Sequence, residues 1–234
     1  MNEIQEQILK QLLYHSKQSF NELWQKKGRS NTFAYHIQML EEQNLIFKQE
    51  DGSYSLTTKG KGHVTFINGE SGKKTKQPLS VVVLGIFKDN KILLMKRAKE
   101  PFKNLWGLPG GKIEFDQFLS QTAATELLEE TGLTGDLTFS GIKHIHTYED
   151  NQFTYSHILY SVRVDNPKGT QLENHKEGEL QWFDINHIPK INHIPDLLLH
   201  VNTFQEKTFT IQEISRNIEN GKFTDITVHK TFQK

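Results

Sequence analysis

The spacing of apolar positions changes along the chain, and the change separates a helical region from one built mainly of strands. In residues 1–66, apolar side chains recur every three or four positions in three segments, which is the period of one face of an α-helix. The positions that mark these faces are Ile4, Ile8 and Leu12, then Phe20, Leu23 and Trp24, and then Phe33, Ile37 and Leu40. We therefore predict three helices in this region.

Short polar residues indicate where these helices begin and end. Ser19 is expected to cap the second helix, and Ser30 or Asn31 the third, because such side chains accept hydrogen bonds from the first free N–H groups of a helix. Asn44 tolerates the left-handed conformation that ends many helices. Two β-like runs then flank Asp51-Gly52, a pair typical of a tight hairpin turn.

Residues 67–78 are polar, contain glycine and have no apolar period, so we predict a linker there. Beyond it the pattern predicts strands at 79–87, 91–97, 137–146, 153–164 and 180–183, and a helix over 117–131 that Gly132 ends. A last helix is expected to begin near Pro195, and the tail from residue 208 to form a hairpin turning at Asn220-Gly221. We thus expect an α+β domain at 79–205 and a C-terminal β-hairpin extension at 206–234.

Composition narrows the function classes. The 234 residues include 28 basic and 28 acidic side chains and no cysteine, which excludes disulfides, thiolate metal sites and cysteine nucleophiles. The first residues are acidic and amphipathic, unlike a signal peptide, and the longest apolar run is too short to span a bilayer. The expectation is a soluble cytoplasmic protein with no membrane partner.

The most informative stretch is the acidic helix. Glu126, Glu129 and Glu130 stand at i, i+3 and i+4, so they share one helical face and repel one another. A solvated acidic face is the common explanation for such a run. A hard divalent cation is the functional one, because Mg²⁺ takes carboxylate oxygens and keeps waters that substrate phosphates can replace.

The residues around the acids favour the cation. Gly111, Glu126, Leu127, Glu129, Glu130, Gly132 and Leu133 match the Nudix box, and residues 106–111 resemble the loop that enters it. This resemblance implies a Nudix α/β/α sandwich with a mixed sheet. It also implies that Glu126, Glu129 and Glu130 are the catalytic and metal-binding residues, with Mg²⁺ as the cofactor and Mn²⁺ as a substitute. The implied substrate is a nucleoside diphosphate derivative, a nucleotide-type small molecule cleaved within its pyrophosphate.

Two positions depart from the Nudix pattern. Gln117 stands where the family has its first glutamate, and Thr125 where it has an arginine. Threonine cannot hold an adjacent carboxylate through two parallel hydrogen bonds as arginine does. The sequence therefore predicts a metal site and leaves the rate of hydrolysis open.

Other candidate site residues carry weaker signals. Arg97 and Lys96 follow a strand and could meet phosphates, and Gly110 and Gly111 are expected beside the substrate. Trp106 could stack on a base, although packing is its more common role. Either Glu177 or Glu179, before Trp182-Phe183, could supply a further acidic ligand. The histidines between His144 and His200 show no metal-binding spacing, and we interpret them as structural.

Residues 1–66 resemble winged helix-turn-helix transcription regulators. The resemblance lies in Ala34, His36-Ile37, Leu40-Glu41 and Asn44-Leu45-Ile46, in the Asp51-Gly52 hairpin and in residues 56–60 after it. Helical spacing places Thr32, Tyr35, His36 and Met39 at i, i+3, i+4 and i+7, turned away from the apolar stripe, and the resemblance implies that this exposed face enters a DNA groove. Arg29, with Lys26 and Lys27, lies just ahead, placed for phosphate contacts, and Lys48, Lys59 and Lys61 lie near the wing.

The region's eight basic and seven acidic residues give it a net charge of only +1, so nonspecific DNA affinity is expected to be weak. A homodimer would double the contacts to DNA.

Three functions remain open at this point. One is an active Nudix hydrolase with an accessory DNA-binding unit, and another is a transcription regulator whose Nudix domain senses a nucleotide with slow or absent hydrolysis. The third, an interaction module that uses both folds as scaffolds, accounts least well for the retained acids. We favour a hydrolase-competent domain in a regulatory protein.

Overall fold

The computed structural model describes residues 1–69, 74–206, 208–220 and 222–233, and these fall into two compact units, residues 1–76 and 77–234. Residues 70–73 of the predicted linker lie outside the described residues, as does Gly221 of the predicted C-terminal turn. Each unit has a separate hydrophobic core.

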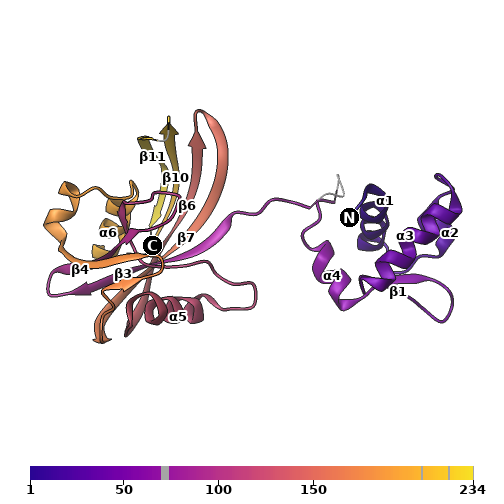
Figure 1. Ribbon diagram of the computed structural model, residues 1–234. Helices are drawn as coiled ribbons and strands as arrows, with labels where there is room; N and C mark the ends of the chain where they lie inside the picture. Colours follow the sequence, from indigo (N-terminus) through magenta and orange to yellow (C-terminus); the bar gives the residue numbers. More distant parts are fainter. Residues whose placement is uncertain (70–73, 207, 221, 234) are drawn as a thin grey trace. The chain divides into compact units, whose positions relative to one another are not determined.

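The first unit contains the three predicted helices and the predicted hairpin (Figure 1). Its elements are α1 (Glu3–Tyr14), α2 (Phe20–Trp24), α3 (Ser30–Glu42), β1 (Ile46–Lys48), β2 (Tyr54–Leu56) and α4 (Thr58–Val64). Ser19 caps α2 as predicted, because its side chain accepts from the N–H of Glu22 while the Glu22 carboxylate accepts from Ser19 N. Asn44 has the predicted left-handed conformation, at φ 56°.

Two expectations about this unit are wrong, and one of its helices is not among those predicted. The third helix has Arg29 at its N-cap with no side-chain hydrogen bond, so neither Ser30 nor Asn31 caps it. Helix α4 was not expected after the hairpin, and Thr57 caps it by accepting from Gly60 N. His36 is only 8% exposed, because it lies three residues from Phe33 on the inward face of the helix.

The second unit is built on one large mixed sheet in the order β11-β10-β6-β7-β3-β4-β9-β8, with β5 paired to β4. Its strands are β3 (Leu79–Lys88), β4 (Lys91–Arg97), β5 (Trp106–Gly107), β6 (Leu133–Glu149), β7 (Gln152–Gly169), β8 (Asn174–His175), β9 (Gly178–Asp184), β10 (Thr210–Glu219) and β11 (Lys222–Gln233). The pairs β3–β7 and β6–β10 are parallel and the others antiparallel.

Helices cover both faces of this sheet, as the predicted sandwich requires (Figure 1). Helix α5 (Leu119–Thr131) packs Ala123 and Leu127 against Val82 and Leu84 of β3. A 3₁₀ turn, η1 (Ile185–Lys190), and helix α6 (Leu197–Gln205) pack on the other face, where Phe87 meets Phe204. Successive strand residues point to opposite faces, so β3 contributes to both cores.

Some predicted boundaries in this unit shift. Helix α5 begins at Leu119 rather than at 117, which leaves Gln117 in the preceding turn, and α6 begins at Leu197, two residues after Pro195. The C-terminal hairpin forms as predicted and adds β10 and β11 to the main sheet beside β6. Within the part of the chain described, no helix is both long and apolar enough to span a bilayer.

Candidate active site

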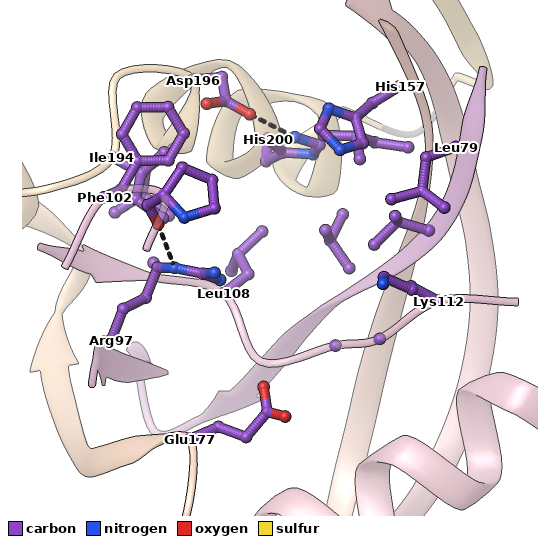
Figure 2. Close-up of a pocket in the computed structure, with 18 of the residues that line it drawn as sticks. Leu79, Arg97, Phe102, Leu108, Lys112, His157, Glu177, Ile194, Asp196 and His200 are labelled. Atoms are coloured by element: carbon purple, nitrogen blue, oxygen red, sulfur yellow. Dashed lines mark hydrogen bonds and ion pairs between the residues drawn. The ribbon is translucent and has the colours of Figure 1, made fainter. Parts of the chain in front are cut away.

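A cavity of about 780 Å³ opens on the sheet of the second unit (Figure 2). Carboxylates gather at one end, and Figure 2 shows Glu177 there, across the cavity from Asp196 and His200. The acidic residues of this end, here called the carboxylate end, are Glu114, Glu126, Glu130 and Glu177. The volume lies in the range of small-molecule sites.

Glu130 is the most buried of these acids, at 4% exposed. Its Oε2 accepts a hydrogen bond of 2.7 Å from Gly110 N, which joins the loop before α5 to the last turn of that helix. Burial raises the pKa of Glu130 to about 8, helped by the charges of Glu126 and Glu177 and opposed by the Gly110 hydrogen bond. A cation at this end would offset the free-energy cost of ionising the buried Glu130.

Glu126 is partly buried one turn earlier on the same helix. Its carboxylate lies against Gly111, and it occupies the place that a β-carbon at position 111 would need. Burial raises its pKa, and the nearby charges of Glu129, Glu177 and Glu114 act in the same direction. The absence of a side chain at Gly111 is what allows Glu126 to reach the cavity.

Some of the glutamates that the sequence analysis proposed as metal ligands line the cavity, and others are exposed outside it. Glu129 is exposed and is not among the described residues that line the cavity. Of the two alternatives in the later segment, Glu177 lines the cavity and forms a 2.6 Å ion pair with Lys99, whereas Glu179 is exposed outside it. Glu177, on the turn before β9, is therefore the better placed of the two.

The donor set at the carboxylate end fits a hard divalent cation. Its oxygens are of the kind that Mg²⁺ prefers, and Mg²⁺ usually binds through one or two carboxylates while waters and phosphates complete its shell. No group of three or more acids or histidines in the described residues is already arranged around a single point. The carboxylate end therefore fits a metal site in which substrate phosphates supply some of the ligands.

The two departures from the Nudix pattern lie close by. Thr125 is exposed on α5 next to Glu126. Gln117 is exposed in the turn before the helix, where its Oε1 accepts from the Thr122 hydroxyl at 3.1 Å. Neither is among the described residues that line the cavity.

Some of the basic and aromatic candidates line the cavity and others do not. Arg97 lines the cavity between its two ends, with Nε donating to Pro101 O at 2.8 Å (Figure 2), and Lys112 lines it as well. Gly110 and Gly111 form part of its wall. Lys96 and Trp106 pair with each other across β4 and β5 outside the lining, and the Trp106 ring packs 4.7 Å from that of Phe183.

The end of the cavity opposite the glutamates was not predicted. It is lined by Tyr155 and His157 of β7, Asp196 and His200 near the start of α6, and Arg216 of β10. These residues are far apart in the sequence and are brought together by strand order. The one available signal was the alternation of Tyr155, His157 and Leu159, which places all three on one face of a strand.

Three of the four DNA-contact candidates in the first unit are exposed: Arg29, Thr32 and Tyr35, the last at 58%. The fourth, His36, was expected on the same face and is instead turned inward. Asn2 Nδ2, at the N-cap of α1, lies 3.2 Å from His36 Nε2. His36 therefore packs α3 against α1.

Comparisons with known proteins agree with the fold of the second unit. An ADP-ribose pyrophosphatase of Methanocaldococcus jannaschii is 33% identical over 114 residues, which cover 48% of this chain and 66% of that protein, just under two thirds. An oxidized purine nucleoside triphosphate hydrolase of Danio rerio is 33% identical over 115 residues, 49% of this chain and 70% of that protein.

A crystal structure of a MutT protein from Bacillus halodurans superposes with a TM-score of 0.56 at 18% identity, and the match covers 64% of this chain and 97% of that one. At that identity the likeness supports the fold alone. Residues 76–200, just over half of the chain, match the NUDIX domain family, whose members typically use a divalent metal. The chain belongs to the Nudix family.

Proposed function

We propose that the second unit is a divalent-metal-dependent hydrolase that cleaves the pyrophosphate of a nucleoside diphosphate derivative. The observation that carries the proposal is the pair of partly and fully buried carboxylates, Glu126 and Glu130, at one end of a cavity large enough for a nucleotide. Buried acids without a counter-charge are costly, and a divalent cation bound together with the diphosphate would supply the missing positive charge.

Different residues of the cavity would bind the metal, accept a proton and contact the phosphates. A divalent cation, when bound, polarises the diphosphate and lowers the pKa of a coordinated water. Glu126, Glu130 and Glu177 would hold the cation, and one of the three would accept a proton from the attacking water. Gly110 N orients Glu130 through its hydrogen bond, and Arg97 lies where it can meet phosphate oxygens.

ADP-ribose is the substrate that we propose to test first. The archaeal relative is an ADP-ribose pyrophosphatase, and the carboxylate end accounts for only part of the cavity. The remaining length would hold a group attached to the diphosphate. An oxidised purine nucleoside triphosphate is the alternative that the second relative favours.

The test is a turnover screen with millimolar Mg²⁺ over nucleoside diphosphate derivatives and nucleoside triphosphates. We expect hydrolysis that requires the metal and falls by at least about 10²-fold in Glu130→Gln. Glu179→Gln, an exposed acid two residues from Glu177, is the matched control and should hydrolyse as the unchanged protein does. Metal-independent turnover, or equal rates in the two variants, would contradict the proposal.

We also propose a second function for the first unit: a winged helix-turn-helix that binds DNA, so that the chain is a nucleotide-responsive regulator. The order of three helices followed by a hairpin supports it, as does the exposure of Thr32 and Tyr35 on α3. Arg29, Lys26 and Lys27 are exposed just before that helix. In a homodimer two such helices would meet successive turns of a duplex.

A further inference from the structure

The C-terminal hairpin supplies a side chain to the cavity from outside the family's matched span. Among the described residues that line the cavity, Arg216 alone comes from beyond residue 200. It pairs with Thr147 across β10 and β6, and Thr147 pairs with Tyr155 across β6 and β7. Side chains directly opposite each other across strands share a face, so Arg216 and Tyr155 both face the cavity.

Arg216 is held firmly there, at 4% exposed. Its Nε donates to the Thr147 hydroxyl at 2.8 Å and its Nη1 to Asp196 Oδ1 at 3.0 Å. The ring of Phe102, on the loop between β4 and β5, lies 4.8 Å from the guanidinium carbon. These three contacts fix the direction in which the guanidinium points.

Asp196 depends on this arginine. It is 4% exposed, and burial opposes its ionisation, yet the Arg216 charge and the contact with His200 hold the pKa of Asp196 well below its usual range. Its Oδ2 lies 3.4 Å from His200 Nε2 (Figure 2), and His200 Nδ1 lies 2.9 Å from the Ser161 hydroxyl. A buried carboxylate that loses its counter-charge is strongly destabilised in the ionised form.

This end of the cavity suits an uncharged ring. Asp196 offers an acceptor to the ligand beside the positive charge of Arg216, and a charged ligand group would be repelled by one or the other. Two further buried polar atoms, Tyr155 Oη and His157 Nδ1, have no hydrogen-bond partner among the described residues. The wall around them is aliphatic, formed by Leu79, Val81, Leu108, Leu159, Ile194 and Leu197. A flat heterocycle with donors and acceptors on its edge matches both features.

We propose that Arg216 is a positioning residue that holds Asp196 in place to recognise the base of the substrate, so that the C-terminal hairpin is a specificity element of this chain. The proposal rests on the proposed function, because it assigns the far end of the same cavity. Arg216 acts through Asp196, and the diphosphate lies at the carboxylate end, away from both.

Calorimetric titration with three probes tests this division, with Ca²⁺ in place of Mg²⁺ so that ADP-ribose is bound without being cleaved: inorganic pyrophosphate, ADP and ADP-ribose. Arg216→Met is expected to weaken ADP and ADP-ribose equally, by at least about tenfold, and to leave pyrophosphate unchanged. Ser215→Ala, which alters the neighbouring residue on the opposite face of β10, is the matched control. Arg216→Lys is expected to restore part of the lost affinity. If Arg216→Met does not fold, the Asp196→Asn/Arg216→Gln double variant replaces the ion pair with a neutral hydrogen-bonded one.

A pH profile separates positioning from general support of the fold. In the unchanged protein the ratio of ADP affinity to pyrophosphate affinity should stay constant from pH 5 to 8, and in Arg216→Met it should change as Asp196 takes up a proton. Taking the ratio of the two affinities cancels any effect of pH that ADP and pyrophosphate share. Besides Arg216, the charged groups that act on Asp196, His157 or His200 are Arg97, Lys112 and Lys143.

The outcomes are distinguishable. No pyrophosphate binding by the unchanged protein would contradict the proposed function itself. Pyrophosphate binding with no tighter binding of ADP would overturn the base subsite alone. A loss in Arg216→Met confined to ADP-ribose would place the distal sugar at this end instead, and an equal loss for all three probes would make Arg216 a structural residue only.

Discussion

The carboxylate of Glu126 fills the space beside Gly111, so that a methyl group at position 111 would overlap it. Gly111 does not have a left-handed backbone, and an alanine there would therefore strain little except the Glu126 side chain. We predict that Gly111→Ala keeps the fold, displaces Glu126 and lowers kcat by at least about tenfold.

Steady-state kinetics of Gly111→Ala measure the loss in kcat, and thermal melting shows whether the fold is kept. Gly62→Ala is the control, because nothing lies within 4 Å of a β-carbon there and the residue is in helix α4 of the other unit. It should be neutral or slightly stabilising. Full activity in Gly111→Ala would show that the position of Glu126 does not matter.

The elements of both units could be predicted largely from apolar spacing, because burial of one face imposes the periods of helix and strand. The carboxylate end could be predicted too, since Glu126 and Glu130 lie on one helix and their proximity follows from helical geometry alone. Glu129 shares the motif and yet is exposed. Motif membership therefore did not show which acids face the cavity.

The opposite end could not be predicted, because Tyr155, Asp196 and Arg216 meet only through the pairing of β10 with β6. Nothing in local spacing indicates which strands will be neighbours. His36 was assigned to the wrong face for a different reason. Its spacing of four residues from Thr32 and three from Met39 indicated the exposed face, whereas its three-residue spacing from Phe33, which the structure shows to be decisive, indicates an inward position.

Metal binding should distinguish Glu177 from Glu179. Millimolar Mg²⁺ or Mn²⁺ is expected to raise the melting temperature, because a ligand that binds only the folded state stabilises it, by about 2.7 kcal/mol at one hundred times Kd. Glu126→Gln, Glu130→Gln and Glu177→Gln should each reduce this rise. Glu179→Gln should not, since its side chain lies outside the cavity. A melting temperature that no metal concentration changes would count against the site.

The two departures from the Nudix box should limit turnover. An arginine at position 125 would stand next to Glu126 and could hold its carboxylate, and such supporting contacts are worth about 10- to 100-fold. We predict that Thr125→Arg raises kcat and that Gln117→Glu adds to the gain. Ala124→Arg places the same charge on the neighbouring exposed position and is the control. If neither variant exceeds the unchanged protein on any accepted substrate, these positions do not attenuate the enzyme.

Lys143 should make the stability of the second unit depend on pH. It is fully buried on β6, donates to the Thr203 hydroxyl at 2.7 Å, and burial lowers its pKa to about 8 from an ordinary value of 10.5, opposed by the charges of Asp196 and Glu206. Because the folded-state pKa is the lower one, the unfolded chain binds more protons between those pH values. The free energy of unfolding should therefore rise from pH 8 to 10.5.

Lys143→Met should remove that rise and increase stability at pH 7 by up to about 3 kcal/mol, the equivalent of the pKa shift. Urea unfolding at several pH values measures both effects, and Lys91→Met, an exposed lysine on β4, is the control. The same slope in Lys143→Met and in the unchanged protein would show that another group titrates.

The proposed DNA contacts are of two kinds, contacts to bases and contacts to phosphates. Tyr35 and Thr32 are exposed on α3, so replacing both by alanine is expected to reduce discrimination between promoter and random DNA. Replacing Lys26, Lys27 and Arg29 should weaken binding to both DNAs and lower the salt dependence by up to about one unit for each lost phosphate contact. His36→Ala should instead lower the melting temperature, because His36 of α3 is buried and lies against Asn2 at the start of α1.

Titration of labelled promoter DNA at several salt concentrations, with and without ADP-ribose and Mg²⁺, measures these effects. Replacing Lys88, Lys91 and Lys168, three exposed lysines of the second unit, is the charge-matched control and should leave DNA affinity unchanged. If the chain is a nucleotide-responsive regulator, ADP-ribose must change DNA affinity, and DNA must change ADP-ribose affinity by the same factor. Absence of promoter binding at low salt would exclude the regulator and leave the hydrolase, whereas binding that no nucleotide alters would leave a DNA-tethered enzyme without sensing.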